Sequence, residues 1–165
     1  MRLFLKATHR IGILLFICFA ASHAVQAQGL PDTWQPGMVL TTYYGGGMRP
    51  QSDSLRIAEA ISFERHSGMN NKKYAFHFSA QELNNLLRFL KEKHFDKIRT
   101  GQPAMVYDGW SSDITLQWNN RFIIIETGAG YDVPETYRKD LSDIIQYINS
   151  MVDLKKKDRK SKPMS

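Results

Sequence analysis

The fold of this chain is constrained most by its first 27 residues, whose pattern is that of a segment removed before folding. The segment begins with three basic residues and no acidic one, continues with an apolar run over 11–21, and ends in Val25-Gln26-Ala27. This order is typical of a secretory signal peptide, and the run is shorter than the roughly 20 residues of a membrane span. We expect cleavage after about Ala27, no transmembrane segment in the remaining chain, and a periplasmic or secreted location.

The only cysteine, Cys18, lies inside the apolar run, so the cleaved chain has no thiol and no disulfide. Its stability must therefore come from packing alone. Residues 28–153 have the length of one domain with a single core. We expect three parts: a signal peptide at 1–27, an α+β domain at 28–153 and a disordered basic tail at 154–165.

The net charge of +6 belongs to the two ends of the chain. The leader holds three and the tail six of the 22 basic residues, which leaves 13 basic and 15 acidic residues in 28–153. Because the domain carries no basic stripe with interleaved aromatic residues, nucleic acid is not an expected partner. The tail residues Lys155, Lys156 and Lys157 are expected to contact an anionic surface weakly.

Alternating apolar and polar residues predict three strands in the first half of the domain. Their expected ranges are 38–44, 55–63 and 74–78. Ser79 and Glu82 then stand in the order of a capping box, and leucines follow at helical spacing. We therefore expect a helix over 79–93.

The second half of the domain predicts a hairpin and a second helix. Asn119-Asn120 divides the alternating segment 114–125, and asparagine tolerates the positive φ of a two-residue turn. A further short strand over 105–107 is an open alternative. Pro134 precedes a long apolar stripe that should end near Val152. The resulting order is β-β-β-α-(β)-β-β-α, which predicts an α+β fold with an antiparallel sheet of four to five strands and two helices on one face.

The loop from Asp108 to Asp113 has the most varied chemistry, because two carboxylates flank two hydroxyls and Trp110 offers an apolar platform. It lacks the Asp-x-Asp-x-Asp order of a calcium loop, so a plain turn between strands is the favoured interpretation. The glycine-containing loop 127–132 lacks the third glycine of a dinucleotide site and the lysine of a phosphate loop. An alternative hypothesis is a hydrolase or ligand-binding site where the two loops meet, with Asp132 beside the other two carboxylates.

No cofactor, metal ion or catalytic residue is expected from the spacing of the polar residues. The histidines of the cleaved chain share no zinc-type spacing, and no cysteine assists them. They are His66, His77 and His94. Serine, histidine and aspartate all occur, but no arrangement of them indicates a triad or a carboxylate pair.

A partner surface is expected on the face of the sheet that the two helices leave open. Thr115, Gln117 and His77 are polar positions on the predicted strands, and they are mixed with the apolar residues Phe122 and Ile124. Asp108, Trp110 and Asp113 of the 108–113 loop complete this candidate surface.

The order of segments resembles that of small uncharacterised exported α+β domains of bacteria. The shared parts are a Gly-Gly strand end at Gly45-Gly46, the helix start Phe78-Ser79-Ala80-Gln81-Glu82-Leu83, and the hairpin from Trp118 to Ile125 before the last helix. The leader that ends at Ala27-Gln28 is similar to Gram-negative export signals. The resemblance covers most of 38–152 and carries over no activity and no functional residue.

These observations favour a non-enzymatic exported domain that binds another protein or a cell-envelope polymer. Two alternatives stay open. One is the small periplasmic hydrolase or ligand-binding enzyme described above, and the other is an inhibitor or immunity protein directed against a secreted enzyme.

Overall fold

A computed structural model describes residues 29–46, 51–68, 71–101, 109–128 and 130–161 of the chain. The chain divides into two compact units, Met1–Pro31 and Asp32–Ser165. Only the last three residues of the first unit are described, so the expected signal peptide lies outside the described residues. The same holds for Asp108 and for the strand expected over 105–107.

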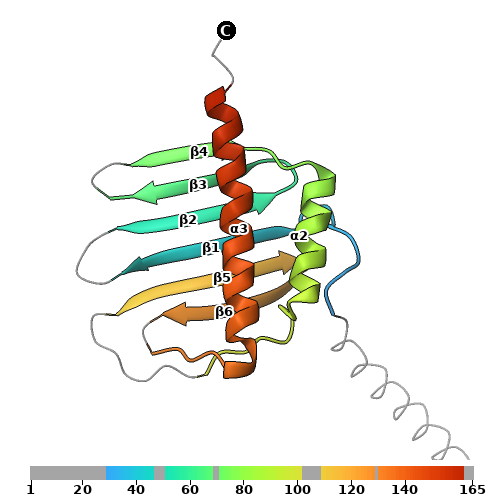
Figure 1. Ribbon diagram of the computed structural model, residues 1–165, viewed down its shortest axis with the longest axis vertical. Coiled ribbons are helices and arrows are strands. Elements are labelled where there is room, and N and C mark those ends of the chain that lie inside the picture. Colours follow the sequence, from blue (N-terminus) through green and yellow to red (C-terminus); the bar gives the residue numbers. More distant parts are fainter. Residues whose placement is uncertain (1–28, 47–50, 69–70, 102–108, 129, 162–165) are drawn as a thin grey trace, which may run out of the picture. The chain divides into compact units, whose positions relative to one another are not determined.

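The second unit is an α+β domain in which all the paired strands are antiparallel. Its sheet has the order β4-β3-β2-β1-β5-β6. The strands are β1 (Val39–Gly46), β2 (Ser52–Ala58), β3 (Ser62–Ser67), β4 (Lys72–Phe76), β5 (Trp110–Trp118) and β6 (Arg121–Gly128). Two helices, α2 (Ala80–Glu92) and α3 (Glu135–Ser161), lie on the same side of this sheet (Figure 1). The predicted fold class, antiparallel sheet and two helices are confirmed.

The number of strands is corrected from four or five to six, and the element order is β-β-β-β-α-β-β-α in the described part of the chain. The single strand expected over 55–63 is two strands, because the chain turns between Ala58 and Ser62. The hydroxyl of Ser62 accepts a hydrogen bond from the Ala58 N–H at 3.1 Å and donates to the Ala58 carbonyl at 3.2 Å. Glu59, the residue that interrupts the alternation in the sequence, stands in this turn.

The helix expected over 79–93 is confirmed as α2. Ser79 is its N-cap, and the Ser79 hydroxyl and the Glu82 carboxylate each accept a backbone N–H of the other residue. The leucines at helical spacing are buried against the sheet and α3. They are Leu83, Leu86, Leu87 and Leu90.

The core fills the layer between the sheet and the two helices. The sheet contributes buried residues such as Leu40 of β1 and Leu116 of β5, and α3 contributes Ile144 and Ile148. The helices also contact each other directly, because the Phe89 and Tyr147 rings stack with centroids 4.2 Å apart. Burying these side chains is the main source of stability for a domain without disulfides.

The predicted hairpin is confirmed between β5 and β6. Trp118 pairs with Arg121 across the turn, and Asn119 and Asn120 adopt φ values of 45° and 59°. Both values are positive, as a type I′ turn requires at its two central residues.

The expected end of the last helix near Val152 is wrong, because α3 continues to Ser161. Lys155 Nζ lies 2.6 Å from Glu82 Oε1 and Lys156 Nζ lies 2.5 Å from Glu64 Oε2. The same ammonium groups lie over the rings of Phe78 and Tyr74. The first part of the tail expected to be disordered is therefore helical, and two of the three lysines expected at an anionic surface are engaged within the chain. Residues 162–165 lie outside the described residues.

Among the described residues, no helix combines the length and the apolar character needed to cross a bilayer.

Candidate functional site

The strand register separates the predicted site residues onto two faces of the sheet. On β5, Ile114, Leu116 and Trp118 are buried beneath the helices. Because successive side chains of a strand alternate between faces, Asp113, Thr115 and Gln117 lie on the opposite face. We call this face, which the helices leave uncovered, the open face. Its members on β6 are Phe122 and Ile124, which are 58% and 54% exposed.

Trp110 lies on the helix side of the sheet and not with the open face. Its ring lies 5.5 Å from the ring of Tyr44, and the two residues are 45% and 52% exposed. His77 is exposed and follows the last residue of β4. The seven residues of the predicted surface therefore do not form one site, and Asp108 lies outside the described residues.

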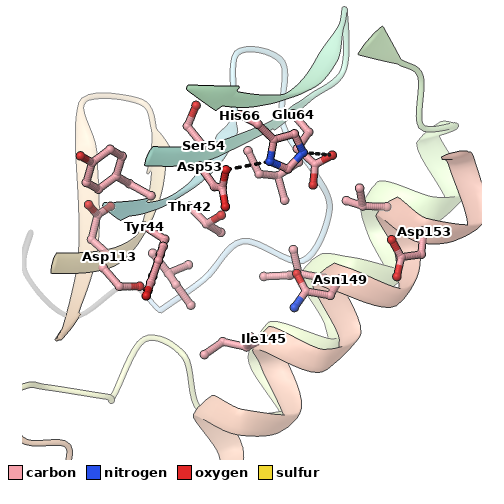
Figure 2. Close-up of a pocket in the computed structure, with 16 residues that line it drawn as sticks. Thr42, Tyr44, Asp53, Ser54, Glu64, His66, Asp113, Ile145, Asn149 and Asp153 are labelled. Carbon is pink, nitrogen blue, oxygen red and sulfur yellow. Dashed lines mark hydrogen bonds and ion pairs between the residues drawn. The ribbon is translucent and has the colours of Figure 1, made fainter. Parts of the chain in front are cut away.

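A cavity of about 470 Å³ lies between the sheet and α3 (Figure 2). We call it the α3 cavity. Thr42, Tyr44, Asp53, Glu64 and His66 reach it from strands β1 to β3. Across from them, α3 contributes Ile145, Ile148, Asn149, Val152 and Asp153.

His66 lies between two carboxylates in this cavity. Its Nδ1 atom is 2.7 Å from Asp53 Oδ1, and its Nε2 atom is 3.1 Å from Glu64 Oε2. Asp53 and His66 are direct cross-strand partners, while Glu64 stands two residues before His66 on the same face of β3. The strand pairing thus places the three side chains next to one another on one face of the sheet.

Glu64 is a largely buried carboxylate of the cavity, with 17% of its side chain exposed. It faces both His66 and Lys156, so the Lys156 ammonium group of α3 offsets its charge and the His66 ring of β3 contacts it. Asp153 precedes Lys156 by about one turn of α3, and its Oδ1 atom lies 3.8 Å from Lys156 Nζ. Asp53 and Asp153 remain more than half exposed at the mouth of the cavity.

A second depression adjoins the α3 cavity and shares Ile145 and Asn149 with it. Trp110 and Thr127 line this depression together with Arg138 of α3. The loops that the enzyme hypothesis requires to meet thus contribute one residue each to a common groove.

The carboxylates of the enzyme hypothesis do not meet in that groove. Asp113 belongs to the open face, where its carboxylate accepts a hydrogen bond from the Thr115 hydroxyl at 3.3 Å. Burial raises the pKa of Asp113, and the nearby charge of Glu126 adds to this effect. Asp132 pairs with Arg138 at 3.1 Å. Neither carboxylate lines the depression formed by Trp110 and Thr127, but Asp113 is among the residues that line the adjoining α3 cavity.

In the part of the chain that the structure describes, no group of three or more metal-ligating side chains is arranged to hold a metal ion. The sequence does not predict the contact between His66 and the two carboxylates, because Glu64 and His66 lie beyond the strand expected over 55–63. The available signal was the pattern Glu64-x-His66 on one face of a strand, where apolar residues would be expected on a side covered by a helix.

No protein-family model matches the chain, and no curated protein matches its sequence.

Proposed function

We propose that this protein is an exported, non-enzymatic binding domain that holds a basic side chain of a partner protein in the α3 cavity. The observation that carries the proposal is the composition of the cavity, which combines several carboxylates with apolar side chains of α3. The partly exposed rings of Tyr44 and Trp110 lie beside these groups. Such a mixture of apolar lining and a few placed polar groups is typical of binding sites.

Export is supported by the order of basic, apolar and small residues over 1–27. Small proteins outside the cytosol are often stabilised by disulfides. The expected cleaved form has no cysteine, so packing alone has to form the scaffold of its binding site. The sheet and α3 supply this scaffold, because both walls of the cavity belong to elements with buried cores.

The charge balance of the α3 cavity favours a cationic ligand. Four carboxylates line it in the described part of the chain, whereas His66 is its one basic lining residue; the four are Asp53, Glu64, Asp113 and Asp153. Lys156 offsets part of this negative charge from one side. A lysine or arginine side chain would place its charged end near Asp53 and Asp153 at the mouth.

The apolar and aromatic surfaces suit the rest of such a side chain. Ile145 and Val152 line the cavity on α3 and can cover the aliphatic stem of a lysine or arginine. The exposed ring of Tyr44 can attract a cation through its face, as can Trp110. The adjoining depression extends the site along α3, so there is room for neighbouring residues of a bound segment.

The geometry of His66 favours binding over acid–base catalysis. A general base must present a free ring nitrogen to the proton that it removes. Both ring nitrogens of His66 face carboxylate oxygens within 3.1 Å. The imidazole therefore serves to hold the two carboxylates in place.

The proposal is tested by titrating purified protein with blocked Gly-Xaa-Gly peptides, where Xaa is arginine, lysine, glutamine or glutamate. Binding is followed by NMR, and we expect the backbone amide resonances of Asp53, His66 and Asn149 to shift with the arginine and lysine peptides. The glutamine and glutamate peptides should bind at least tenfold more weakly.

The double variant Asp53→Asn/Asp153→Asn should weaken binding of the arginine peptide more than tenfold, because it removes two exposed carboxylates of the cavity. The matched control Glu59→Gln/Glu135→Gln makes the same charge change at exposed sites away from the cavity. Equal binding of all four peptides would contradict the proposal. If none of the peptides bound but a cell-envelope glycan added in a parallel titration did, the proposal would also be contradicted, in favour of a cell-envelope polymer as the partner.

A further inference from the structure

The open face carries a row of side chains whose charge changes sign from one edge of the sheet to the other. One residue from each strand contributes to the row, and each is the direct cross-strand partner of the next. In order across the sheet they are Lys73, Arg65, Ser54, Tyr43, Asp113 and Glu126. The row therefore reads as two cations, two neutral residues and two anions. We call it the charge row.

This arrangement is unfavourable within a single copy of the chain. Arg65 stands directly opposite Lys73, and Asp113 stands directly opposite Glu126. Like charges at directly opposite positions repel, which costs stability in the isolated sheet. Among the described residues, no carboxylate lies within ion-pair distance of Arg65 or Lys73.

The charge row is complementary to itself after a half turn. Consider a two-fold axis that lies between two facing sheets and runs parallel to their strands. Rotation about it places the β4 edge of one copy over the β6 edge of the other. Each cross-strand row then faces the same row of the second copy, in reversed order. Lys73 then faces Glu126 of the second copy, and Arg65 faces Asp113. The symmetry supplies four oppositely charged pairs from one row.

The apolar residues of the open face follow the same symmetry. The neighbouring row contains Ile124 at the β6 side, and Ala75 and Phe63 at the β4 side. After the half turn, Ile124 faces that β4 side of the second copy. The exposed apolar surface of Ile124 and Phe122 is then removed from water, which is the main driving force for association.

The dimensions of the open face suit a stable interface. Six strands spaced about 4.8 Å apart, with a mean length of about seven residues, give a face of about 29 Å by 24 Å. With the relief of the side chains, this is close to the roughly 800 Å² per partner of a standard interface. Two sheets packed face to face keep their strands within about 30° of each other, so the long charged side chains can still meet.

We propose that two copies of this chain pack open face against open face about such an axis, with the basic half of each charge row on the acidic half of the other. Both helices lie on the opposite side of the sheet (Figure 1), so this dimer leaves the α3 wall of the cavity uncovered, although Tyr43 and Asp113 of the charge row also line the cavity from the sheet. The dimer does not depend on the proposed binding function.

The proposal is tested by exchanging the two halves of the charge row. The basic half is reversed in Arg65→Glu/Lys73→Glu, and the acidic half is reversed in Asp113→Lys/Glu126→Lys. Each variant alone would place like charges opposite each other in the dimer, so we expect at least hundredfold weaker self-association by analytical ultracentrifugation. An equimolar mixture of the two variants should restore a 1:1 dimer, because the remaining halves are again complementary.

Several controls make the result decisive. The variant Arg88→Glu/Lys97→Glu makes the same charge change as the first variant on exposed residues outside the sheet, and it should dimerise like the unaltered protein. Circular dichroism verifies that each variant is folded, and Phe122→Asp provides an independent disruption within the apolar part of the face. A monomeric unaltered protein at 100 µM, dimers that persist in both reversed variants, or a mixture that stays monomeric would each overturn the proposal.

Discussion

Lys93 Nζ lies 2.5 Å from Asp143 Oδ2, so an ion pair between two largely buried side chains joins the C-terminal end of α2 to α3. The pair shifts both groups toward their charged forms. A hydrogen bond from Lys93, followed by one from Lys139, lowers the pKa of Asp143 below 3.8. The hydrogen bond with Asp143 raises the pKa of Lys93 above 10.5, against the opposing effect of desolvation.

We predict that Asp143→Asn destabilises the protein at pH 7 and that the loss fades in acid. A carboxylate whose pKa is lowered by folding stabilises the native state above its unfolded pKa, and this stability is lost as the pH falls through the folded pKa. Urea unfolding at pH 7 and at pH 2.5 should therefore give a larger difference from the unaltered protein at pH 7. The matched control Lys139→Gln removes only a highly exposed partner of Asp143 and should have a smaller effect. A loss that is the same at both pH values would refute the role of this ion pair.

Asp113→Asn should have the opposite sign and stabilise the monomer at pH 7. Burial and the charge of Glu126 raise the pKa of Asp113, so the folded protein favours the protonated form. Native stability then increases as the pH falls through the raised pKa, and the gain is complete below the unfolded value of 3.8. We expect the variant to gain about 0.5 kcal/mol in dilute solution at pH 7 and nothing at pH 2.5. Asp32→Asn is the contrasting variant, because Lys91 lowers the pKa of Asp32 and its removal should destabilise instead.

The parts of the fold that the sequence predicts are those with local signals. The capping box at Ser79 and the leucine spacing specify α2, and Asn119-Asn120 specifies the hairpin. The split between β2 and β3 has a weak signal, because Glu59 stands at the turn without a glycine, proline or asparagine beside it. The length of α3 depends on ion pairs with residues far away in the sequence, so periodicity alone ends the helix too early.

The sites depend on pairings that a single sequence does not reveal. Asp53 meets His66 only because β2 and β3 pair in one register, and α3 must cross them to close the cavity. The charge row requires β5 to pair with β1, two strands that are separated by four other elements. Open-face positions such as Thr115 follow from alternation alone, whereas the order of strands across the sheet does not.

Replacing Asn120 tests the backbone geometry of the β5–β6 turn. Its φ of 59° lies in the left-handed region, where glycine is unstrained and a β-branched residue is disfavoured. Asn120→Gly should be neutral or stabilising, and Asn120→Val should cost about 1–2 kcal/mol in the free energy of unfolding. Thermal unfolding followed by circular dichroism measures both. If valine and glycine were tolerated equally, the turn would not require a positive φ at this position.

The processing of the leader is checked by intact-mass spectrometry of the protein recovered from its producing cells. The residues Val25-Gln26-Ala27 predict a mature chain that begins at Gln28. Replacing Ala27 with a bulky residue such as Leu should retain the leader, because the cleavage site requires small side chains. A mature protein that still carries residues 1–27, together with recovery from the cytosol, would contradict the proposed export.

The last turns of α3 are predicted to contribute to stability through the stems and charges of two lysines. Lys155 and Lys156 are mostly buried, form ion pairs with Glu82 and Glu64, and cover the rings of Phe78 and Tyr74. Lys155→Ala/Lys156→Ala should destabilise the domain by about 1–2 kcal/mol, because packing and charge are both lost. Methionine at the same two positions keeps an apolar stem and should lose less. Lys157→Ala is the control, since Lys157 is exposed, and a disordered tail would make all three variants equal in stability to the unaltered protein.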